Sequence, residues 1–173
     1  MKKIAIIYWP KKGSTEKVAH LLQDKLGKDN ADVFTIKDIT DEDFAYYGAF
    51  IIGAPTTGAD NWEHAHKTAW HEFFAKILKA DLKGKPYAIY GLGDGVRYPY
   101  HFVNGMIDIK KQFDKTEAKY CGAWPQKGYE FKESASIIDD KFVGLALDED
   151  NEHELTDGRI DQWLKLIIKD FGK

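Results

Sequence analysis

The stretch IAIIYWPKKGSTEKVAHLL, residues 4–22, decides the fold of this chain. Its first part, residues 4–8, is a continuous apolar run of the kind that forms buried β-strands. From residue 16 onward the apolar side chains recur with helical spacing, and a polar loop at residues 9–15 separates the two patterns. A strand that enters a helix through such a loop predicts an anion site, because the unpaired N–H groups of the first helical turn converge there.

Three residues at the end of this loop suit anion binding. Gly13 lets an anion approach the backbone, and Ser14 and Thr15 add hydroxyl donors. The same two hydroxyls also suit plain helix capping. The loop alone therefore leaves phosphate binding and helix capping open as interpretations.

Strands and helices alternate along the rest of the chain. We expect strands at 3–8, 32–36, 48–54 and 86–91, with a last pair of segments near 117–121 and 141–147, and helices at 15–26, 62–79, 99–111 and 156–171. The central strands are apolar throughout, as in parallel sheets that are covered on both faces. Without any linker, repeat or low-complexity segment, this pattern predicts one α/β domain over residues 1–173, with helices on both faces of a doubly wound parallel sheet of five strands.

Ligands of open α/β sheets bind beyond the carboxyl ends of the strands, which directs attention to three loops. Besides residues 9–15, these are residues 54–62 and 91–100. The second loop offers hydroxyls, a glycine and Trp62, and the third offers three glycines, Asp94 and Tyr98. Aromatic rings on opposing loops suit a planar ligand, although core packing explains any single aromatic in a chain that is 14% aromatic.

Composition excludes several classes of protein. The 173 residues contain no apolar run as long as a membrane span requires, and the N-terminus lacks the features of a signal peptide. We expect a cytoplasmic protein in which the single Cys121 is a buried structural thiol. His64, His66 and His71 are not spaced to share one helix face, so no metal site is expected.

Charge is distributed unevenly, although the formal net charge is only −3. Residues 1–37 hold eight lysines and four acidic residues, whereas residues 139–161 hold nine acidic residues against Lys141 and Arg159. The acidic segment argues against nucleic-acid binding. It suits either the steering of a basic partner or a merely solvated surface.

Taken together, these motifs resemble the flavodoxins, in particular the long-chain type. The third loop GLGD, residues 91–94, is followed by Tyr98 as in that family, and GAPT at 53–56 and GSTE at 13–16 also fit. The segments GYEF at 128–131, FVGLALDEDN at 142–151 and LTD at 155–157 resemble the insertion that interrupts the last strand of long-chain members, together with the closing helix. The resemblance covers essentially the whole chain.

The resemblance implies FMN as cofactor and low-potential, single-electron transfer as function. It implies a monomeric electron carrier rather than an enzyme, with a reductase and an electron acceptor as protein partners and with neither nucleic acid nor membrane. The cofactor-binding residues that it implies are Pro10, Lys11, Lys12, Gly13, Ser14 and Thr15 in the first loop; Thr56, Thr57, Gly58 and Trp62 in the second; Gly91, Leu92, Gly93, Asp94 and Tyr98 in the third; and Asp150 near the rim.

The three loops have different implied roles. The first wraps the FMN phosphate, and the second adds hydroxyl contacts and the Thr57-Gly58 peptide, which reorients when the flavin is reduced. The third binds the pyrimidine edge through its backbone and Asp94, while Tyr98 stacks on the outer face of the ring.

Two departures from the family pattern carry hypotheses of their own. Pro10 and Lys12 stand where the family usually has hydroxyl residues, so we expect Lys11 or Lys12 to pair with the FMN phosphate. Thr57 stands where the family often has the tryptophan of the inner flavin face, so we expect Trp62 to take that place. A second tryptophan then belongs to the core, at the start of an apolar stripe that comprises Trp70, Phe73, Phe74 and Ile77.

Other functions remain open on the same fold. A flavin-dependent quinone or azo-type reductase needs a substrate pocket over the flavin, which Trp62 and Tyr98 would block. The unusual first loop also leaves open a flavodoxin-like protein that has lost FMN. A response-regulator domain does not fit, because the first and third strands end at Tyr8 and Ala54 without an acidic cluster.

Overall fold

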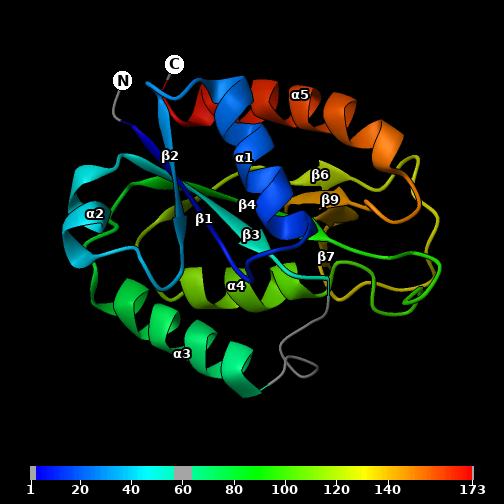
Figure 1. The fold of residues 1–173 in the computed structure, drawn as a ribbon, viewed down its shortest axis with the longest axis horizontal. Coiled ribbons are helices and arrows are strands. Elements are labelled where there is room, and N and C mark those ends of the chain that lie inside the picture. Colours follow the sequence, from blue (N-terminus) through cyan, green and yellow to red (C-terminus); the bar gives the residue numbers. More distant parts are fainter. Residues whose placement is uncertain (1–2, 57–63, 173) are drawn as a thin grey trace.

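A parallel sheet with the strand order β2-β1-β3-β4-β5 forms the centre of the computed structural model, which describes residues 3–56 and 64–172 (Figure 1). Its strands are β1 (Ile4–Tyr8), β2 (Ala31–Thr35), β3 (Ala49–Ala54), β4 (Pro86–Leu92) and β5 (Lys119–Tyr120), and β9 (Leu145–Leu147) also pairs with β4. Every pairing in this sheet is parallel. The expected five-stranded, doubly wound α/β sheet is confirmed.

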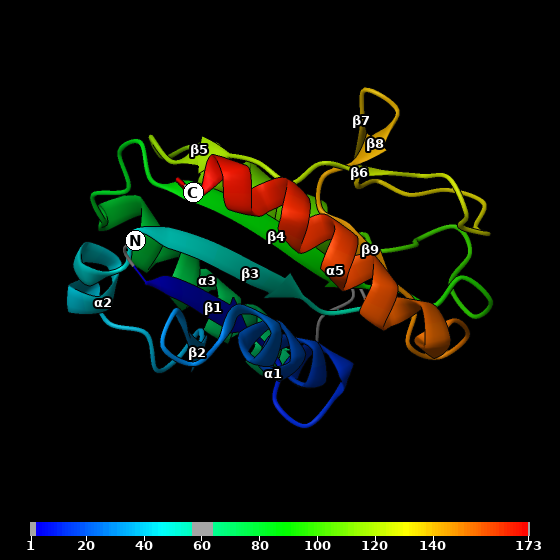
Figure 2. The ribbon, with the colours of Figure 1, turned by 90° about the horizontal axis from the view of Figure 1, so that it is seen from above.

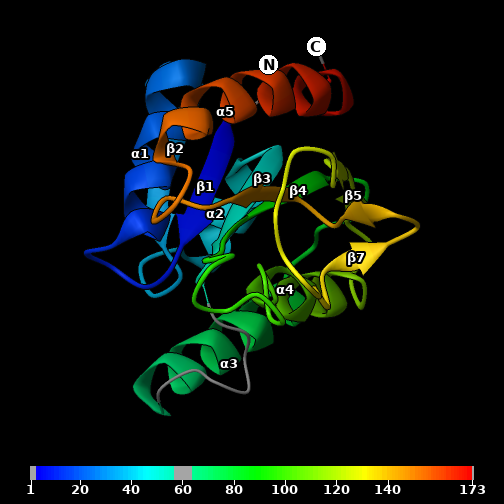
Figure 3. The same cartoon turned by 90° about the vertical axis from the view of Figure 1, so that its right-hand side faces the viewer.

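Helices cover both faces of the sheet. The first face carries α1 (Ser14–Leu26) and α5 (His153–Asp170), and the second carries α3 (His64–Lys79) and α4 (Gly105–Phe113) (Figures 1 and 3). Residues of β1 and β3 are buried along the whole of both strands, which is why their sequences are apolar without alternation. The sheet thus forms the hydrophobic core between two helical layers.

The last strand is divided into two pieces that lie along the same edge of β4. Lys119 and Tyr120 pair with the start of β4, and Leu145–Leu147 pair with its end. The insertion between them contains a small antiparallel sheet of β6 (Trp124–Pro125), β8 (Lys141–Phe142) and β7 (Ile137–Ile138) (Figure 2). The interrupted last strand is confirmed, but the expected strand at 141–147 is two strands that belong to different sheets.

Tyr129 anchors the insertion to the main sheet. Its hydroxyl donates to the carbonyl of Ala146 at 2.6 Å and accepts from the indole N–H of Trp124 at 2.7 Å. The guanidinium of Arg159 lies 3.9 Å from the centre of its ring. One side chain therefore fixes the insertion to both β9 and α5.

Helices α2 (Asp41–Tyr46) and α4 differ most from the sequence prediction, whereas α5 begins only three residues earlier than expected. The short helix α2 was not expected; a reciprocal capping box of Thr40 and Asp43 begins it, and Lys85 donates to the carbonyl of Phe44 at its end. Helix α4 begins at Gly105 rather than at residue 99, because residues 99–104 form turns that the insertion holds. The N–H groups of Lys132 and Glu133 both donate to the carbonyl of Pro99 there.

Candidate functional site

The carboxyl ends of four strands meet at one edge of the sheet. Tyr8 pairs with Gly53, Ala54 with Gly91, and Leu92 with Leu147, so β1, β3, β4 and β9 end side by side. The loops that follow them gather at the same edge, toward the viewer in Figure 3. Parallel register alone thus brings the three expected loops together and adds the segment after β9 as a fourth.

The first loop presents donors that have no internal partner. Gly13 is the N-cap of α1, and no side chain caps the helix. Within the described part of the chain, the hydroxyls of Ser14 and Thr15 have no hydrogen-bond acceptor, and the exposed ammonium groups of Lys11 and Lys12 have no ion pair. Helix capping by these hydroxyls, which the sequence left open, is therefore not what the structure contains.

A hydrogen bond from the sheet holds the start of α1 in place. The buried Tyr90 of β4 donates its hydroxyl to the carbonyl of Thr15 at 2.7 Å. A Cβ atom on Gly53 would collide with this Tyr90 hydroxyl, so β3 requires glycine at its end. The donors of the first turn are consequently fixed relative to the sheet.

Glu16 is a residue of this site that the sequence analysis missed. Its carboxylate turns back to the loop, where it accepts from the backbone N–H of Lys12 at 2.5 Å and from the Tyr8 hydroxyl at 2.8 Å. The hydrogen bond from Lys12, followed by that from Tyr8, lowers the pKa of Glu16 below its ordinary value. A negative charge thus lies within the loop, and the Lys12 N–H is already occupied.

The second loop is described only at its start. Thr56 is half-buried and its hydroxyl has no acceptor among residues 3–56 and 64–172. Thr57, Gly58 and Trp62 lie outside the described residues. The ring of Trp70 is fully buried beside Phe73 and Phe74, which confirms its expected place in the core.

Side chains of Met106 and Phe102 pack so closely against the third loop that Gly91 and Gly93 cannot be replaced by a residue with a Cβ atom. A Cβ atom on Gly91 would collide with the side chain of Met106, and one on Gly93 would collide with Phe102. Leu92 ends β4 with its side chain buried, and the N–H of Gly93 donates to the carbonyl of Leu147 at 2.8 Å. This segment therefore lies pressed between the α4 side of the core and β9.

Asp94 organises the third loop with its own carboxylate. It is buried, and its Oδ1 atom accepts from the N–H groups of Val96 at 3.1 Å and Arg97 at 2.8 Å. Burial alone would raise the pKa of Asp94, but the hydrogen bonds donated to it outweigh burial and lower the pKa below its ordinary value. What this loop offers to a ligand is therefore backbone rather than the Asp94 side chain.

The remaining expected residues lie at the rim. The side chain of Tyr98 is 38% exposed, and its N–H donates to the carbonyl of Asp94. Asp150 is exposed after β9, and Pro10 is half-buried after β1. The sequence missed Asp148 and Asn151, which contact the third loop; they follow the second half of the split strand, where the strand-end rule would have found them.

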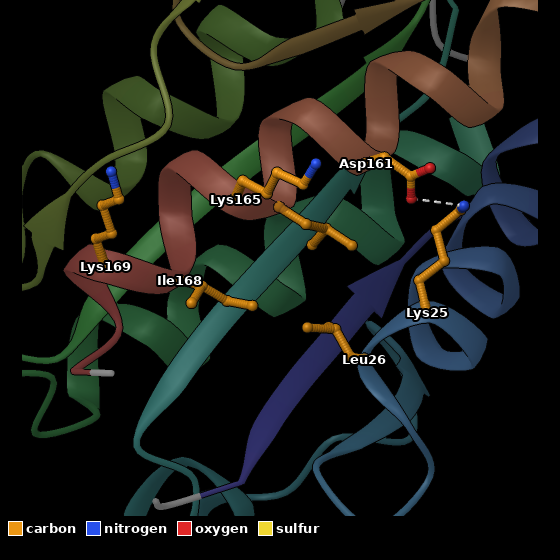
Figure 4. Close-up of a pocket in the computed structure, with 7 residues that line it drawn as sticks. Lys25, Leu26, Asp161, Lys165, Ile168 and Lys169 are labelled. Carbon is orange, nitrogen blue, oxygen red and sulfur yellow. Dashed lines mark hydrogen bonds and ion pairs between the residues drawn. The ribbon is translucent and has the colours of Figure 1, made fainter.

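A cavity of about 600 Å³ lies elsewhere, between α1 and α5 (Figure 4). The ammonium of Lys25 on its wall is paired with Asp157 at 2.8 Å and Asp161 at 2.7 Å. Lys169 points away from it. Leu26, the last residue of α1, also lines the cavity. The cavity therefore lies near the amino ends of the strands, away from the strand-end loops.

Residues 3–56 and 64–172 contain no cluster of histidine, cysteine and carboxylate groups that could hold a metal ion. In that part of the chain, no helix has the length and apolar character needed to cross a membrane. Cys121 is buried, donates to the carbonyl of Tyr87, and has a pKa that burial raises to about 12, as expected for a structural thiol.

The fold defines the class of open, doubly wound α/β proteins that bind ligands at the carboxyl ends of their strands. The flavodoxin family model matches residues 6–163. Flavodoxin of Synechocystis is 36% identical over 168 residues, 96% of each chain, and flavodoxin 1 of Escherichia coli K12 is 36% identical over 160 residues, 91% of this chain and 88% of its own. A crystal structure of Fusobacterium nucleatum flavodoxin bound to flavin mononucleotide superimposes with a TM-score of 0.86 at 29% identity and covers 99% of both chains.

This chain belongs to the flavodoxin family. The resemblance stated from the motifs is therefore confirmed. Flavodoxins carry electrons and are not enzymes, so the family favours a carrier over the reductase considered from the sequence.

Proposed function

We propose that this chain binds FMN at the carboxyl edge of β1, β3 and β4 and carries single electrons between redox partner proteins. The observation that carries this proposal is a set of donors at the start of α1 that have no partner among residues 3–56 and 64–172 and are fixed beside the ends of three strands. A related flavodoxin from Fusobacterium nucleatum has been solved with FMN bound.

The donors of the first loop fit a phosphate group. The Ser14 and Thr15 hydroxyls and the first N–H groups of α1 supply hydrogen bonds, and the helix dipole adds a favourable field. Pro10 offers no N–H group, and the N–H of Lys12 is held by Glu16. The ammonium groups of Lys11 and Lys12 compensate with direct charge, and Thr56 adds a hydroxyl from the second loop.

The other loops hold the ring of the cofactor. The backbone of residues 91–94 would line the pyrimidine edge, Tyr98 would cover the outer face of the ring, and Trp62 of the second loop would cover the inner face. When bound, FMN supplies the redox chemistry. Aromatic rings on both faces exclude water, and the resulting low dielectric disfavours additional negative charge at the site.

The covered ring also explains why the chain acts as a carrier. With Trp62 and Tyr98 over the two faces of a bound ring, a substrate would have no space there, and the cofactor would exchange electrons with another protein through its exposed rim. Thr57-Gly58 is the peptide that adjusts to the redox state, since glycine tolerates both orientations of a peptide. The chain works as one domain and as a monomer, with a reductase upstream and an electron acceptor downstream.

Two successive titrations test this proposal. Adding FMN to the purified apoprotein should quench flavin fluorescence with one equivalent bound. Anaerobic reduction should then proceed in two separate one-electron steps, monitored by absorption. A single two-electron step would favour a flavin enzyme, and a protein that ignores FMN would mean that the altered first loop has abandoned the cofactor. The molar mass of the holoprotein, measured by analytical ultracentrifugation, tests whether it is a monomer.

A further inference from the structure

The third loop is held by two buried aspartates, whose carboxylates accept three consecutive backbone N–H groups while the Asp94 carbonyl accepts a fourth. The N–H of Gly95 donates to Asp148 at 2.9 Å, those of Val96 and Arg97 donate to the Asp94 side chain, and that of Tyr98 donates to the Asp94 carbonyl. Asp94 and Asp148 are only 5% and 4% exposed. The conformation of residues 95–98 therefore depends on where these two aspartates stand.

Asn151 joins the two aspartates. Its side-chain Nδ2 lies 3.0 Å from Oδ1 of Asp94 and 2.9 Å from Oδ2 of Asp148. Its backbone N–H also donates to Asp148 at 3.0 Å. Without this amide, two carboxylates would face each other across the gap between the loop after β4 and the loop after β9, and like charges at short range repel.

The bridge formed by Asn151 lies at the surface of the protein rather than in its core. Asn151 is itself exposed, whereas the carboxylates that it joins are buried. A cation also lies near Asp94: the Nε atom of Arg97 is 3.9 Å from its Oδ2 atom, but the Arg97 side chain is 75% exposed. An exposed amide, rather than a buried ion pair, thus holds the loop that carries Tyr98.

We propose that Asn151 is a positioning residue for the cofactor: its amide locks Asp94 to Asp148 and so preforms residues 95–98, including Tyr98, for the ring of FMN. This inference rests on the proposed function. A loop that is already ordered in the apoprotein loses less conformational entropy when the ligand binds, so loosening it weakens binding without removing any direct contact. Asn151 acts through the aspartates and need not touch the cofactor.

Asn151→Ala, the milder Asn151→Ser and the control Asn104→Ala test the proposal. Asn104 is a suitable control because its side chain also fixes a loop, by accepting from the N–H of Ala135, but in the insertion rather than the third loop. For each apoprotein we would measure amide hydrogen exchange at residues 95–98, the free energy of unfolding and the Kd for FMN. Since Asn151 is exposed, all three variants should fold.

We expect Asn151→Ala to speed exchange at residues 95–98 and to raise the Kd for FMN roughly tenfold, with Asn151→Ser intermediate and Asn104→Ala near wild type. Unchanged amide exchange at residues 95–98 in Asn151→Ala would show that the Asn151 bridge does not order this loop, and the proposal would be rejected. If Asn151→Ala exchanges faster but binds FMN with the same Kd as Asn104→Ala, then Asn151 orders the loop but does not position it for the cofactor. If wild-type protein does not bind FMN, the proposed function fails and this role falls with it.

Discussion

At the scale of single residues, the first loop combines charges of both signs. Lys11 and Lys12 bring two exposed ammonium groups, while the Glu16 carboxylate occupies the N–H of Lys12. A phosphate at the start of α1 is attracted by the former and repelled by the latter. The affinity for FMN therefore depends on a balance that single substitutions can shift in either direction.

The first prediction concerns the two lysines. Changing both Lys11 and Lys12 to Gln should raise the Kd for FMN about tenfold at low salt, because an exposed charge pair contributes roughly 0.2–1 kcal/mol and the two act on one phosphate. Fluorescence titration measures this change. Riboflavin, which has no phosphate, should bind the variant as it binds wild type.

Lys28 and Lys165 provide the charge-matched control. Both are exposed and lie away from the first loop, so changing both to Gln alters the net charge equally. If this control weakens FMN binding as much as the loop variant does, the effect is one of overall charge and the pairing hypothesis is rejected.

The second prediction concerns Glu16. Because the folded state lowers its pKa, Glu16 contributes stability that is fully present above its ordinary value of 4.5 and is lost as the pH falls through the lowered value. The difference in unfolding free energy between wild type and Glu16→Gln should therefore shrink as the pH falls below 4.5. Urea unfolding across this range measures it, and a difference that does not change with pH would contradict the expected contribution.

Elements are held in place by close backbone approaches that only glycine permits. Gly144 precedes β9, and a Cβ atom on it would collide with the carbonyl oxygen of Ile89 in β4. By contrast, Gly158 lies within α5, and a Cβ atom there would meet no other atom within 4 Å. The two glycines therefore have opposite expected responses to the same substitution.

The third prediction uses this pair. Gly144→Ala should lower the free energy of unfolding by about 2 kcal/mol, because the strand backbone must move away from its partner. Gly158→Ala should raise it by roughly 0.5–1 kcal/mol, because alanine favours the helix interior. Urea unfolding of the two variants should bracket the wild type. A stabilised Gly144→Ala variant would mean that β9 can shift without cost.

The sequence predicted those elements that are long and periodic. The apolar runs of β1, β3 and β4 identified the parallel sheet, and its register then predicted which loops share the site. Helix α2 was missed because six residues are too few to establish a period. The role of Asn151 was missed for another reason: although it follows a strand end, its partner Asp94 is 57 positions away, and no local pattern encodes such a contact.

For the molecule as a whole, the uneven charge along the chain is partly neutralised within the fold. Lys25 of α1 pairs with Asp157 and Asp161 of α5, Lys17 pairs with Glu149, and Arg159 pairs with Glu152. The lysine-rich start of the chain thus meets its acid-rich end. Glu149, Asp157 and Asp161 of the acidic segment pair with lysines of α1, which leaves fewer of its charges for steering a partner than the sequence suggested.

The fourth prediction tests this contact. Lys25→Met should lower the free energy of unfolding by about 1 kcal/mol, because it leaves Asp157 and Asp161 facing each other at i, i+4 without a cation. The hydrogen bonds to Asp157 and then to Asp161 raise the pKa of Lys25, so its contribution is present below the ordinary value of 10.5 and is lost as the pH rises through the raised value. Lys28→Met is the control. If both variants lose the same free energy of unfolding, the ion pairs of Lys25 with Asp157 and Asp161 do not stabilise the fold.

Because the last strand is split, the segment between its two halves could be removed without changing how the strands pair. Tyr120 lies opposite Tyr87 and Leu145 lies opposite Tyr90, so only the places opposite Ala88 and Ile89 separate the two halves of the strand. Two residues are enough to join them into one unbroken strand beside β4. A single deletion that left such a bridge would remove the small sheet and Tyr129 yet keep every other strand in register. The register of the sheet thus makes the insertion separable from the strand pairing, even though its residues also pack on the core.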